Sequence, residues 1–400
     1  MSAHSPQFDV ERIRSGIFRA NPRYELVAFD RLRPEQQLLF SELQKDSDLF
    51  GILIPQPGSG LSYKSVCRET ALLFYSMQQP GTIPSSAARS GEIEQIAGTM
   101  VLDSILEISR EDHFVAGADA YDVVCKPRPK TQVVGRIAQL SSAAIRYASL
   151  LDHTDITKLS ARMYFFNRIP ITPKYAQRFP DPDAVADFLG LRDGSAVART
   201  LARDWMAASE TRQTEGWRVW QFRECADKTA APRFKYKLYV SPHVDELKST
   251  FPVIVKTLTE TRAPHFKFGV DAAGILRPDK IVVYFSAVDH LQETAGRLKT
   301  ELSGCPAQAV PFTAELTECG LLSWGMDPPS ESQILSWQER LSWRLWVTNQ
   351  LAMGLLAARE MSSTSMTAAD FAIHRLRHLG VDPETWSPAA SIWAGDDGYR

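Results

Sequence analysis

Basic residues and tyrosines recur at every second position along three short strand-like segments in the second half of the chain. Side chains two residues apart lie on the same face of a strand. The in-phase residues belong to the segments 235–241, 265–269 and 280–285, and Arg277 precedes the third: Lys235, Lys237, Tyr239 and Ser241, then His265 and Lys267, then Lys280 and Tyr284. We therefore expect one sheet face that carries several cations.

Such a face suits an anionic group such as a phosphate. Arginine offers a planar fork of donors to phosphate oxygens, and lysine offers a compact charge. Crowding of cations also lowers the pKa of a lysine toward neutrality, as a general base requires. The alternative is a set of solvated lysines on the open face of an antiparallel sheet. The residues taken alone favour that alternative.

Other candidate motifs carry less chemistry. His374 and His378 have the i, i+4 spacing of a helical metal pair, but Arg375 and Arg377 lie between and beside them and no acidic or cysteine ligand is near. A solvated helix face is the favoured interpretation, and we expect no metal site. The Gly-Ser-Gly sequence at 58–60 lacks the Lys-Ser/Thr of a P-loop, so nucleotide binding has no support.

Composition sets the class of protein. Of the 400 residues, 44% are apolar and 23% are charged, which is typical of globular proteins and excludes a disordered chain. The 45 basic and 47 acidic residues nearly balance, so we expect neither nucleic acid nor membrane as a partner. No segment approaches the roughly 20 apolar residues of a membrane span, and the start has no signal-peptide pattern. Five scattered cysteines indicate reduced thiols and a cytoplasmic protein.

Hydrophobic periodicity predicts an α+β fold. We expect helices over 33–45, 66–77, 134–151, 244–260, 289–302, 335–358 and 367–379. Besides the three segments above, we expect strands over 24–29, 50–54 and 164–168, a hairpin joining 101–108 to 114–115, and a last strand near 320–325. The second half should form a twisted, mainly antiparallel sheet flanked by helices.

We expect the chain to divide into an N-terminal α+β domain that recognises a peptide and a second domain that carries the cationic face. The expected boundaries are a polar arm over 1–22, the first domain over 23–165, the second over 166–360 with its core at 233–329, and a C-terminal helix with a loose tail over 361–400.

The segment from Lys237 to about Trp324 resembles the phosphothreonine-lyase-like domain of class III lanthipeptide synthetases. That domain opens in a Lys-Leu-His-Val-Ser type of strand and continues with a Phe-Lys-Phe strand, a charged loop and a strand containing Val-Tyr. The matching pieces here are 237–241, 266–268, 277–280 and 283–284. The segment is also similar to the stand-alone, effector-like lyases of class V lanthipeptide clusters, which have tyrosine in the first strand. The resemblance covers about a quarter of the chain.

The resemblance implies a reaction and roles for residues. In phosphothreonine lyases a lysine removes the Cα proton of a phosphorylated Ser or Thr, phosphate leaves, and a dehydroamino acid remains. Lys267 matches this general base, Lys237 and Arg277 match contacts to phosphate or carbonyl, and Tyr284 matches a tyrosine of the site. Tyr239 stands where the family has its general-acid histidine, and an unperturbed pKa of about 10 makes tyrosine the weaker acid.

Two histidines are alternative acids. His243 lies four residues after Tyr239, and His265 is in phase with Lys267. For each of them a structural, hydrogen-bonded role is the competing interpretation. Lys235 and Lys280 are expected to add to phosphate binding.

The preferred function is therefore β-elimination of phosphate from phosphoserine or phosphothreonine in a ribosomally synthesised precursor peptide. A separate kinase is an expected partner, because the chain has neither a kinase glycine-rich loop with its lysine nor an HRD/DFG pair. No cofactor is implied. The alternatives are a non-catalytic peptide-binding or scaffolding subunit of a peptide-maturation complex, and an effector that acts on a phosphorylated host protein.

Overall fold

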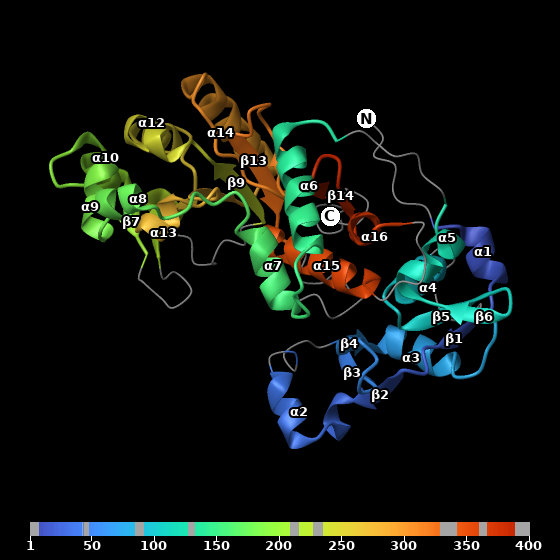
Figure 1. Ribbon diagram of the computed structural model, residues 1–400. Coiled ribbons are helices and arrows are strands. Elements are labelled where there is room, and N and C mark those ends of the chain that lie inside the picture. Colours follow the sequence, from blue (N-terminus) through green and yellow to red (C-terminus); the bar gives the residue numbers. More distant parts are fainter. Residues whose placement is uncertain are drawn as a thin grey trace.

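The computed structural model of the protein describes residues 8–41, 43, 48–84, 92–126, 133–208, 216–226, 235–328, 342–359 and 366–388. One lobe is built by the first 126 residues and the other by a seven-stranded sheet, with helices from both halves of the chain between them (Figure 1). The expected α+β class, with antiparallel sheets flanked by helices, is confirmed. The tail beyond 388 and the start of the helix expected over 335–358 lie outside the described residues.

The N-terminal module, residues 8–126, packs helices on two three-stranded antiparallel sheets, with strand orders β1-β5-β6 and β2-β3-β4. Its strands are β1 Phe18–Ala20, β2 Tyr24–Ala28, β3 Leu49–Pro55, β4 Lys64–Cys67, β5 Leu106–Arg110 and β6 His113–Val115. Its helices are α1 Val10–Ser15, α2 Pro34–Leu39, α3 Arg68–Ser76, α4 Glu92–Leu102 and α5 Tyr121–Val124, with short 3-10 turns η1 Phe29–Arg31 and η3 Gly117–Ala120.

The helical layer joins distant parts of the sequence. It consists of α6 Arg136–Ser149, α7 Ile156–Tyr164, α15 Trp343–Ala358 and α16 Ala368–His378, followed by the short strands β14 Val381–Asp382 and β15 Ser387–Pro388. Helix α15 lies at its centre, with apolar side chains buried around its whole circumference. A helix buried on all sides needs no amphipathic stripe.

The sheet module, residues 169–326, holds the seven-stranded sheet, whose neighbouring strands are all antiparallel. The strand order is β12 Ala314–Glu315, β13 Leu322–Met326, β9 Tyr236–Val240, β11 Ile281–Phe285, β10 His265–Gly269, β8 Trp217–Phe222 and β7 Trp205–Ala207. Its helices are α8 Pro173–Arg178, α9 Pro182–Phe188, α10 Ala196–Asp204, α11 Arg223–Ala226, α12 Leu247–Glu260, α13 Ala272–Ile275 and α14 Val288–Glu301, with a 3-10 turn η5 Val244–Glu246.

The two faces of the seven-stranded sheet have opposite character. Phe266, Phe268 and Val283 are buried on one face, in the core that also holds the apolar sides of α12 and α14. Because side chains alternate along a strand, Lys267 and Tyr284 lie on the other face. The apolar face therefore fixes which side chains the second face presents.

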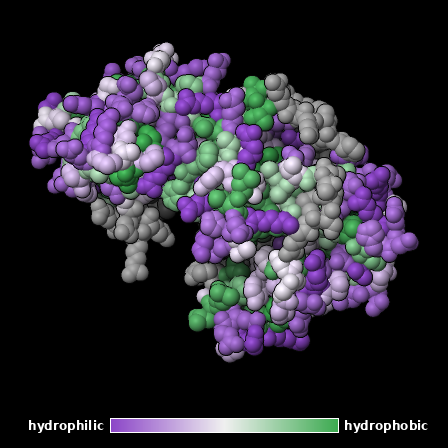
Figure 2. Space-filling model, viewed as in Figure 1, coloured by the Kyte–Doolittle hydropathy of each residue, from purple (hydrophilic) through white to green (hydrophobic). Residues whose placement is uncertain are grey.

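Several sequence predictions need correction. Residues 164–168, expected as a strand, are the end of α7 and the turn after it. Among the described residues of the helix expected over 33–45, the α-helical part is α2, where Leu38 and Leu39 are 77% and 69% exposed. Apolar spacing alone misled here, because the residues that the spacing assigns to a core face are not buried. Hydrophobic residues accordingly gather on the surface around α2 in Figure 2.

The described part of the segment expected as a polar arm contributes to a core. Within the range expected as a polar arm, Ile13 and Phe18 are fully buried in the N-terminal core. Between residues 101 and 108, Val101 and Leu102 belong to the end of α4, and only Leu106 onward forms the expected hairpin with β6.

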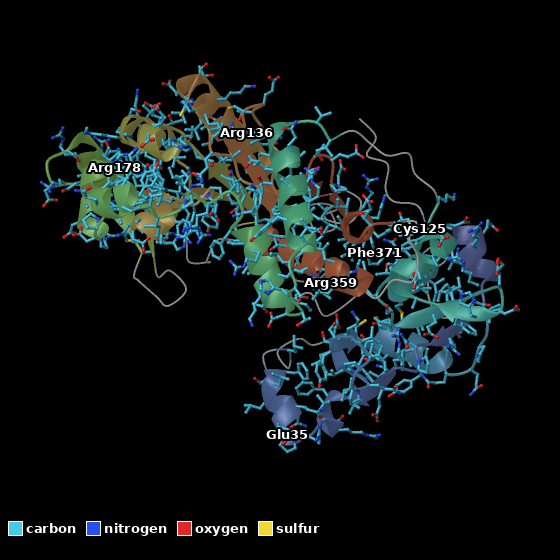
Figure 3. The ribbon with its side chains drawn as sticks, viewed as in Figure 1. Glu35, Cys125, Arg136, Arg178, Arg359 and Phe371 are labelled. Atoms are coloured by element: carbon cyan, nitrogen blue, oxygen red, sulfur yellow. The ribbon has the colours of Figure 1, made fainter. Side chains whose placement is uncertain are left out.

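Helix α16 connects the helical layer to the N-terminal module, so the solvated face expected for its histidines is wrong. His378 is buried, stacks on Phe8 at 4.2 Å between ring centroids, and lies 3.2 Å from the Sγ atom of Cys125. Arg375 is also buried and pairs with Asp103 of the N-terminal module at 2.5 Å. Figure 3 labels Phe371 and Cys125, which belong to the same core where the two parts meet.

A glycine sets how closely α15 and α16 approach. A Cβ atom at Gly354 would lie 2.8 Å from the Cα of Ala372.

We expect Gly354→Leu to destabilise the protein by about 1–3 kcal/mol, because the larger side chain overpacks the crossing of α15 and α16. Urea unfolding measures this change. The control is Gly296→Ala on exposed α14, where nothing lies within 4 Å of the added atom. It should stabilise by up to about 1 kcal/mol. Equal effects of the two changes would contradict this account.

Candidate functional site

The strand register brings the sequence-predicted residues together on one face of the sheet. Lys267 is paired with Val282, which is paired on its other side with Tyr239. His265 is paired with Tyr284, which is paired in turn with Lys237. Directly paired residues of neighbouring strands lie on the same face of a sheet. The side chains that alternation places on one face within each segment therefore share that face across all three strands.

Lys267 has aromatic neighbours and is mostly buried. Its Nζ atom lies 4.2 Å from the ring centroid of Trp217 and 5.8 Å from that of Tyr284. In the part of the chain that the structure describes, no carboxylate forms an ion pair with it. An ammonium with aromatic rings rather than anions as close neighbours is less stabilised than a salt-bridged one.

The environment of Lys267 lowers its pKa to about 8. Burial is the main cause, because it removes water from the charged form, and the charges of Lys237 and Arg277 act in the same direction. Asp279 and Asp327 oppose the shift from a distance. A substantial fraction of Lys267 is therefore neutral near pH 8, as a general base must be.

Lys237 is held by a carboxylate that the sequence interpretation missed. Its Nζ atom lies 2.6 and 2.5 Å from the two carboxylate oxygens of Asp327. The same carboxylate accepts the backbone N–H of Trp343 at the start of α15, at 2.9 Å. The Lys237 ammonium also lies 5.5 Å from the ring centroid of Tyr284. Asp327 thus ties the sheet face to the helical layer.

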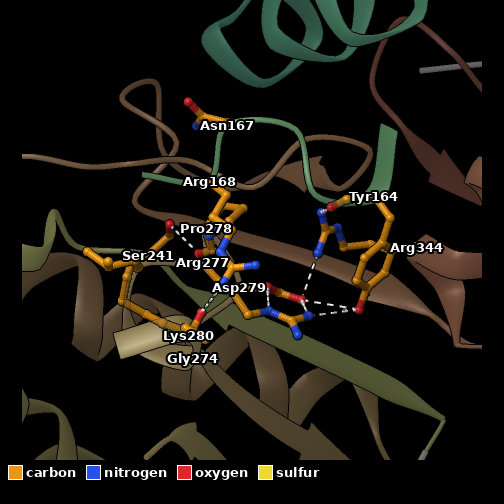
Figure 4. Close-up of polar contacts among 12 residues, drawn as sticks. Tyr164, Asn167, Arg168, Ser241, Gly274, Arg277, Pro278, Asp279, Lys280 and Arg344 are labelled. Carbon is orange, nitrogen blue, oxygen red and sulfur yellow. Dashed lines mark hydrogen bonds and ion pairs between the residues drawn. The ribbon is translucent and has the colours of Figure 1, made fainter. Parts of the chain in front are cut away.

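Arg277 belongs to a buried network with a second arginine (Figure 4). Its Nε and Nη2 atoms both donate to Asp279 at 2.8 Å, and Nη2 donates to the Tyr164 hydroxyl at 3.2 Å. The Asp279 carboxylate also accepts from Nη1 of Arg344 at 2.7 Å. Arg344, only 1% exposed, donates further to the backbone oxygens of Tyr164 and Pro311.

This network keeps its charges. Burial opposes ionisation of Asp279, but Arg344, Arg277 and Lys267 together hold its pKa well below the usual range. Burial would likewise lower the pKa of Arg277, but Asp279 and Tyr164 raise it. Two guanidinium groups thus share one carboxylate, and Lys237 has one of its own. With Lys267 protonated, the face carries a surplus of two positive charges, which matches the charge of a phosphate monoester dianion.

Two tyrosines complete the face as hydrogen-bond donors. Burial raises the pKa of Tyr239 and of Tyr284 well above 10, so both hydroxyls keep their protons at neutral pH. Tyr239 is 3% exposed and packs beside Val282 and Val310. Because its pKa is raised, the Tyr239 hydroxyl is a weaker acid than a free tyrosine.

The two candidate histidines lie in different places. His265 is on the face, with its ring 5.0 Å from that of Tyr284, and burial together with Lys267 lowers its pKa to about 4. It is therefore neutral at pH 7 and is no source of an imidazolium proton. His243 precedes η5 away from the face, where its ring lies 3.5 Å from Asp245.

Lys280 immediately precedes β11, and its backbone carbonyl accepts the N–H of Gly269 on β10. Its Nζ atom donates to the Pro242 carbonyl at 2.9 Å and to the Gln308 side chain at 2.7 Å, and the residue is 1% exposed. Lys235 precedes β9, and its backbone pairs with Phe285 and Asp327.

Sequence reasoning missed five residues of this site, namely Tyr164, Trp217, Asp279, Asp327 and Arg344. Asp279 carried a signal, because it lies between Arg277 and Lys280 in the predicted charged loop. The other four come from strands and helices whose arrival at this face depends on the tertiary fold.

A small hollow opens beside the face, with a volume of about 300 Å³. It is lined by Phe165, Arg168, Gly216, Trp217, Asp271, Ala273, Gly274 and Arg277. The Arg277 guanidinium lies 4.9 Å from the Trp217 ring centroid and 5.3 Å from that of Phe165. The arginine is thus held between the cationic face and a partly aromatic hollow.

Two further features bear on the class of site. Across the described ranges, no group of three or more His, Cys, Asp or Glu side chains is arranged to hold a metal ion. None of the described helices combines the length and the apolar character that crossing a membrane requires.

Comparison with known proteins gives distant structural similarities. No protein-family model matches the chain, and no curated protein does. The chain is similar to an effector protein from Pseudomonas syringae pv. tomato strain DC3000, with 12% identity and a TM-score of 0.38, covering 63% of this chain and 98% of that one. An effector protein from Pseudomonas syringae pv. syringae strain 61 has 11% identity and a TM-score of 0.39, covering 64% and 99%.

Asp279 should be essential for stability because it balances two buried guanidinium groups. We expect Asp279→Asn to lower the free energy of unfolding by about 3–5 kcal/mol, as when one partner of a buried pair is removed. The control is Asp245→Asn, which breaks an exposed pair with Arg178 and should cost at most about 1 kcal/mol. Urea unfolding measures both.

The pH dependence of unfolding gives a second measurement of Asp279. Since the folded state lowers its pKa, the carboxylate stabilises the fold above its unfolded pKa of about 4 and loses that contribution as the pH falls. Asp279→Asn should therefore weaken the loss of stability on acidification. If the natural protein and Asp279→Asn lost the same stability on acidification, the ion pairs of Asp279 would contribute nothing to the free energy of unfolding.

Proposed function

We propose that this protein is a lyase that eliminates phosphate from phosphoserine or phosphothreonine in a ribosomally synthesised precursor peptide, giving dehydroamino acids. A separate kinase supplies the phosphorylated peptide. The observation that carries the proposal is Lys267, a mostly buried amine with a pKa of about 8 and no ion pair in the described chain, on a face with surplus positive charge. The resemblance of the segment from Lys237 to about Trp324 to the phosphothreonine-lyase-like domain supports the same assignment.

The reaction assigns a distinct task to Lys267. Its neutral amine takes the Cα proton of the phosphorylated residue and becomes an ammonium. The electron pair of the broken C–H bond forms the Cα=Cβ double bond, and the Cβ–O bond breaks with its electrons leaving on the phosphate. No water enters the product, so the peptide loses phosphoric acid and not merely a phosphoryl group.

The remaining residues serve the leaving group. Arg277 and Arg344, which share Asp279, offset the charge that develops on the phosphate. A dianionic monoester needs a proton as it leaves, and in our proposal the Tyr239 hydroxyl supplies it. The resulting tyrosinate then recovers a proton from the Lys267 ammonium through solvent, which closes the cycle. The net change moves one proton from Cα to phosphate.

A second function has its own supporting observations. Asp279 accepts hydrogen bonds from Nε and Nη2 of Arg277, Asp327 is paired with Lys237, and the residue at the proposed acid position, Tyr239, has a raised pKa. These features suit a protein that binds a phosphorylated or acidic peptide without turning it over. The two functions differ in what they require of Lys267.

Mass spectrometry of a phosphoserine- and phosphothreonine-containing precursor, incubated with the protein and its native kinase, tests the proposal. We expect each phosphosite to lose the mass of phosphoric acid with the natural protein, and Lys267→Ala and Lys267→Arg to abolish this loss while the phosphopeptide still binds. The arginine keeps the charge but does not deprotonate. Lys248→Ala, on exposed α12, is the matched control and should keep full activity.

An intact phosphopeptide that nevertheless binds to the natural protein would establish the binding function instead. In that case Lys267→Ala should change only the affinity. Elimination by Lys267→Arg at the natural rate would refute the role of Lys267 as base.

The pH profile follows from the two perturbed groups. Elimination requires neutral Lys267 and protonated Tyr239, so the rate should rise about tenfold per pH unit below pH 8 and level off above it. Because the pKa of His265 is about 4, its ring is already neutral above pH 5. Its titration should therefore not lower the rate of elimination between pH 5 and 8. Initial rates measured from pH 6 to 9.5 check this, with His265→Gln as the control. A rate that falls above pH 7 would indicate a histidine acid.

A further inference from the structure

The outer strand of one N-terminal sheet has an open edge. In the order β1-β5-β6, strand β6 has a neighbour on one side. Ser109 of β5 gives its backbone N–H to Ile17 on the β1 side. Its partner across the ladder, Phe114, therefore directs its own N–H and C=O away from β5. Among the described residues no backbone hydrogen bond reaches either group.

The chain after β6 continues this edge. Ala116, two residues beyond Phe114, is still extended, with φ −145° and ψ 173°. The backbone N–H and C=O groups of residues two apart point to the same edge of a strand. Phe114 and Ala116 therefore offer donors and acceptors at the spacing that a neighbouring strand would need. Strand β6 lies at the rim of the N-terminal module, on the side away from the seven-stranded sheet (Figure 1).

A hollow of about 500 Å³ runs along the same segment. Its lining residues are Arg23, Gly60, Leu61, Ser104, Glu107, Arg110, all of 113–119, and Ala357. The side chain of Phe114 is fixed on the sheet by Arg19, whose guanidinium carbon lies 4.2 Å from the ring centroid. The hollow therefore borders the segment 113–119 and includes apolar surface from Leu61 and Phe114.

Two arginines and two carboxylates line the hollow, namely Arg23, Arg110, Glu107 and Asp119. Glu107 is paired with Arg19 at 2.6 Å, and Arg110 is paired with Asp122 at 2.7 Å. Within the described chain, Arg23 has no ion pair. Arg23 is therefore the lining cation with which an acidic side chain of a ligand would pair.

We propose that β6 binds an extended acidic peptide segment as a fourth strand of this sheet. The peptide backbone pairs with Phe114 and Ala116, an acidic side chain reaches Arg23, and apolar side chains lie against Phe114 and Leu61. Extended backbone is the ligand that repeats donors and acceptors at the spacing of a strand edge, and strand addition is an established mode of peptide recognition. The inference concerns a second surface and does not depend on elimination at Lys267.

A displayed library of random linear dodecapeptides, selected on the full chain, tests the proposal. We expect enrichment of acidic sequences with alternating β-branched residues. Phe114→Pro removes the outward N–H without touching the β5–β6 hydrogen bonds, and Arg23→Glu reverses the charge. Both should weaken binding of the selected peptides at least about tenfold. Lys248→Glu, on distant α12, should leave it unchanged.

Two further measurements protect the test against misfolding. Urea unfolding shows whether each variant is folded, and Arg23→Glu stands alone if Phe114→Pro is not. Hydrogen exchange on the natural protein should show protection of the Phe114 and Ala116 amides when a selected peptide is bound. Selection of no peptide, selection of basic peptides, or equal binding to all variants would each overturn the proposal, as would unchanged exchange at both amides.

Discussion

The arrangement of this site depends on one carboxylate that balances two buried guanidinium groups. Asp279 precedes β11, Arg277 lies two residues before it, and Arg344 comes from α15 in the helical layer. Neither arginine could be buried at this depth without a counter-charge, because the desolvation of an unpaired ion is too costly. The same contact therefore closes the sheet module onto the helical layer and fixes where positive charge is available to a ligand.

The site combines two kinds of cation with different consequences. Arg277, Arg344 and Lys237 are paired with carboxylates, whereas Lys267 has aromatic rings as close neighbours and its pKa is lowered to about 8. Paired cations provide a fixed electrostatic field, and the unpaired one provides a titratable amine. The titratable amine is the feature that supports the proposal of catalysis rather than of anion binding alone. Tyr239, with its raised pKa, is a weak acid.

Most of the correct predictions came from the local alternation of side chains along strands and from apolar spacing along helices. Alternation along 235–241, 265–269 and 280–285 was sufficient to place Lys237, Tyr239, Lys267 and Tyr284 on one face, because a sheet with one buried side leaves a strand no other orientation. Helices α6, α14 and α16 followed from their apolar spacing. Asp327 and Arg344 could not be predicted, since their role depends on the docking of α15, which nothing in their own segments encodes. The hydrogen bonds of the Lys280 side chain to Pro242 and Gln308 could not be predicted either, since they depend on how distant segments pack beside it.

The antiparallel pairing of β10 limits which mutations this chain can tolerate during evolution. Its residues alternate between the core, with Phe266 and Phe268, and the cationic face, with Lys267. Deleting a single residue within β10 would invert that assignment and would bury the amine while exposing a phenylalanine. Substitutions can adjust this site one side chain at a time, but changes in length are confined to the loops. The number and order of residues within a strand are thus more tightly constrained than the identity of most of those residues.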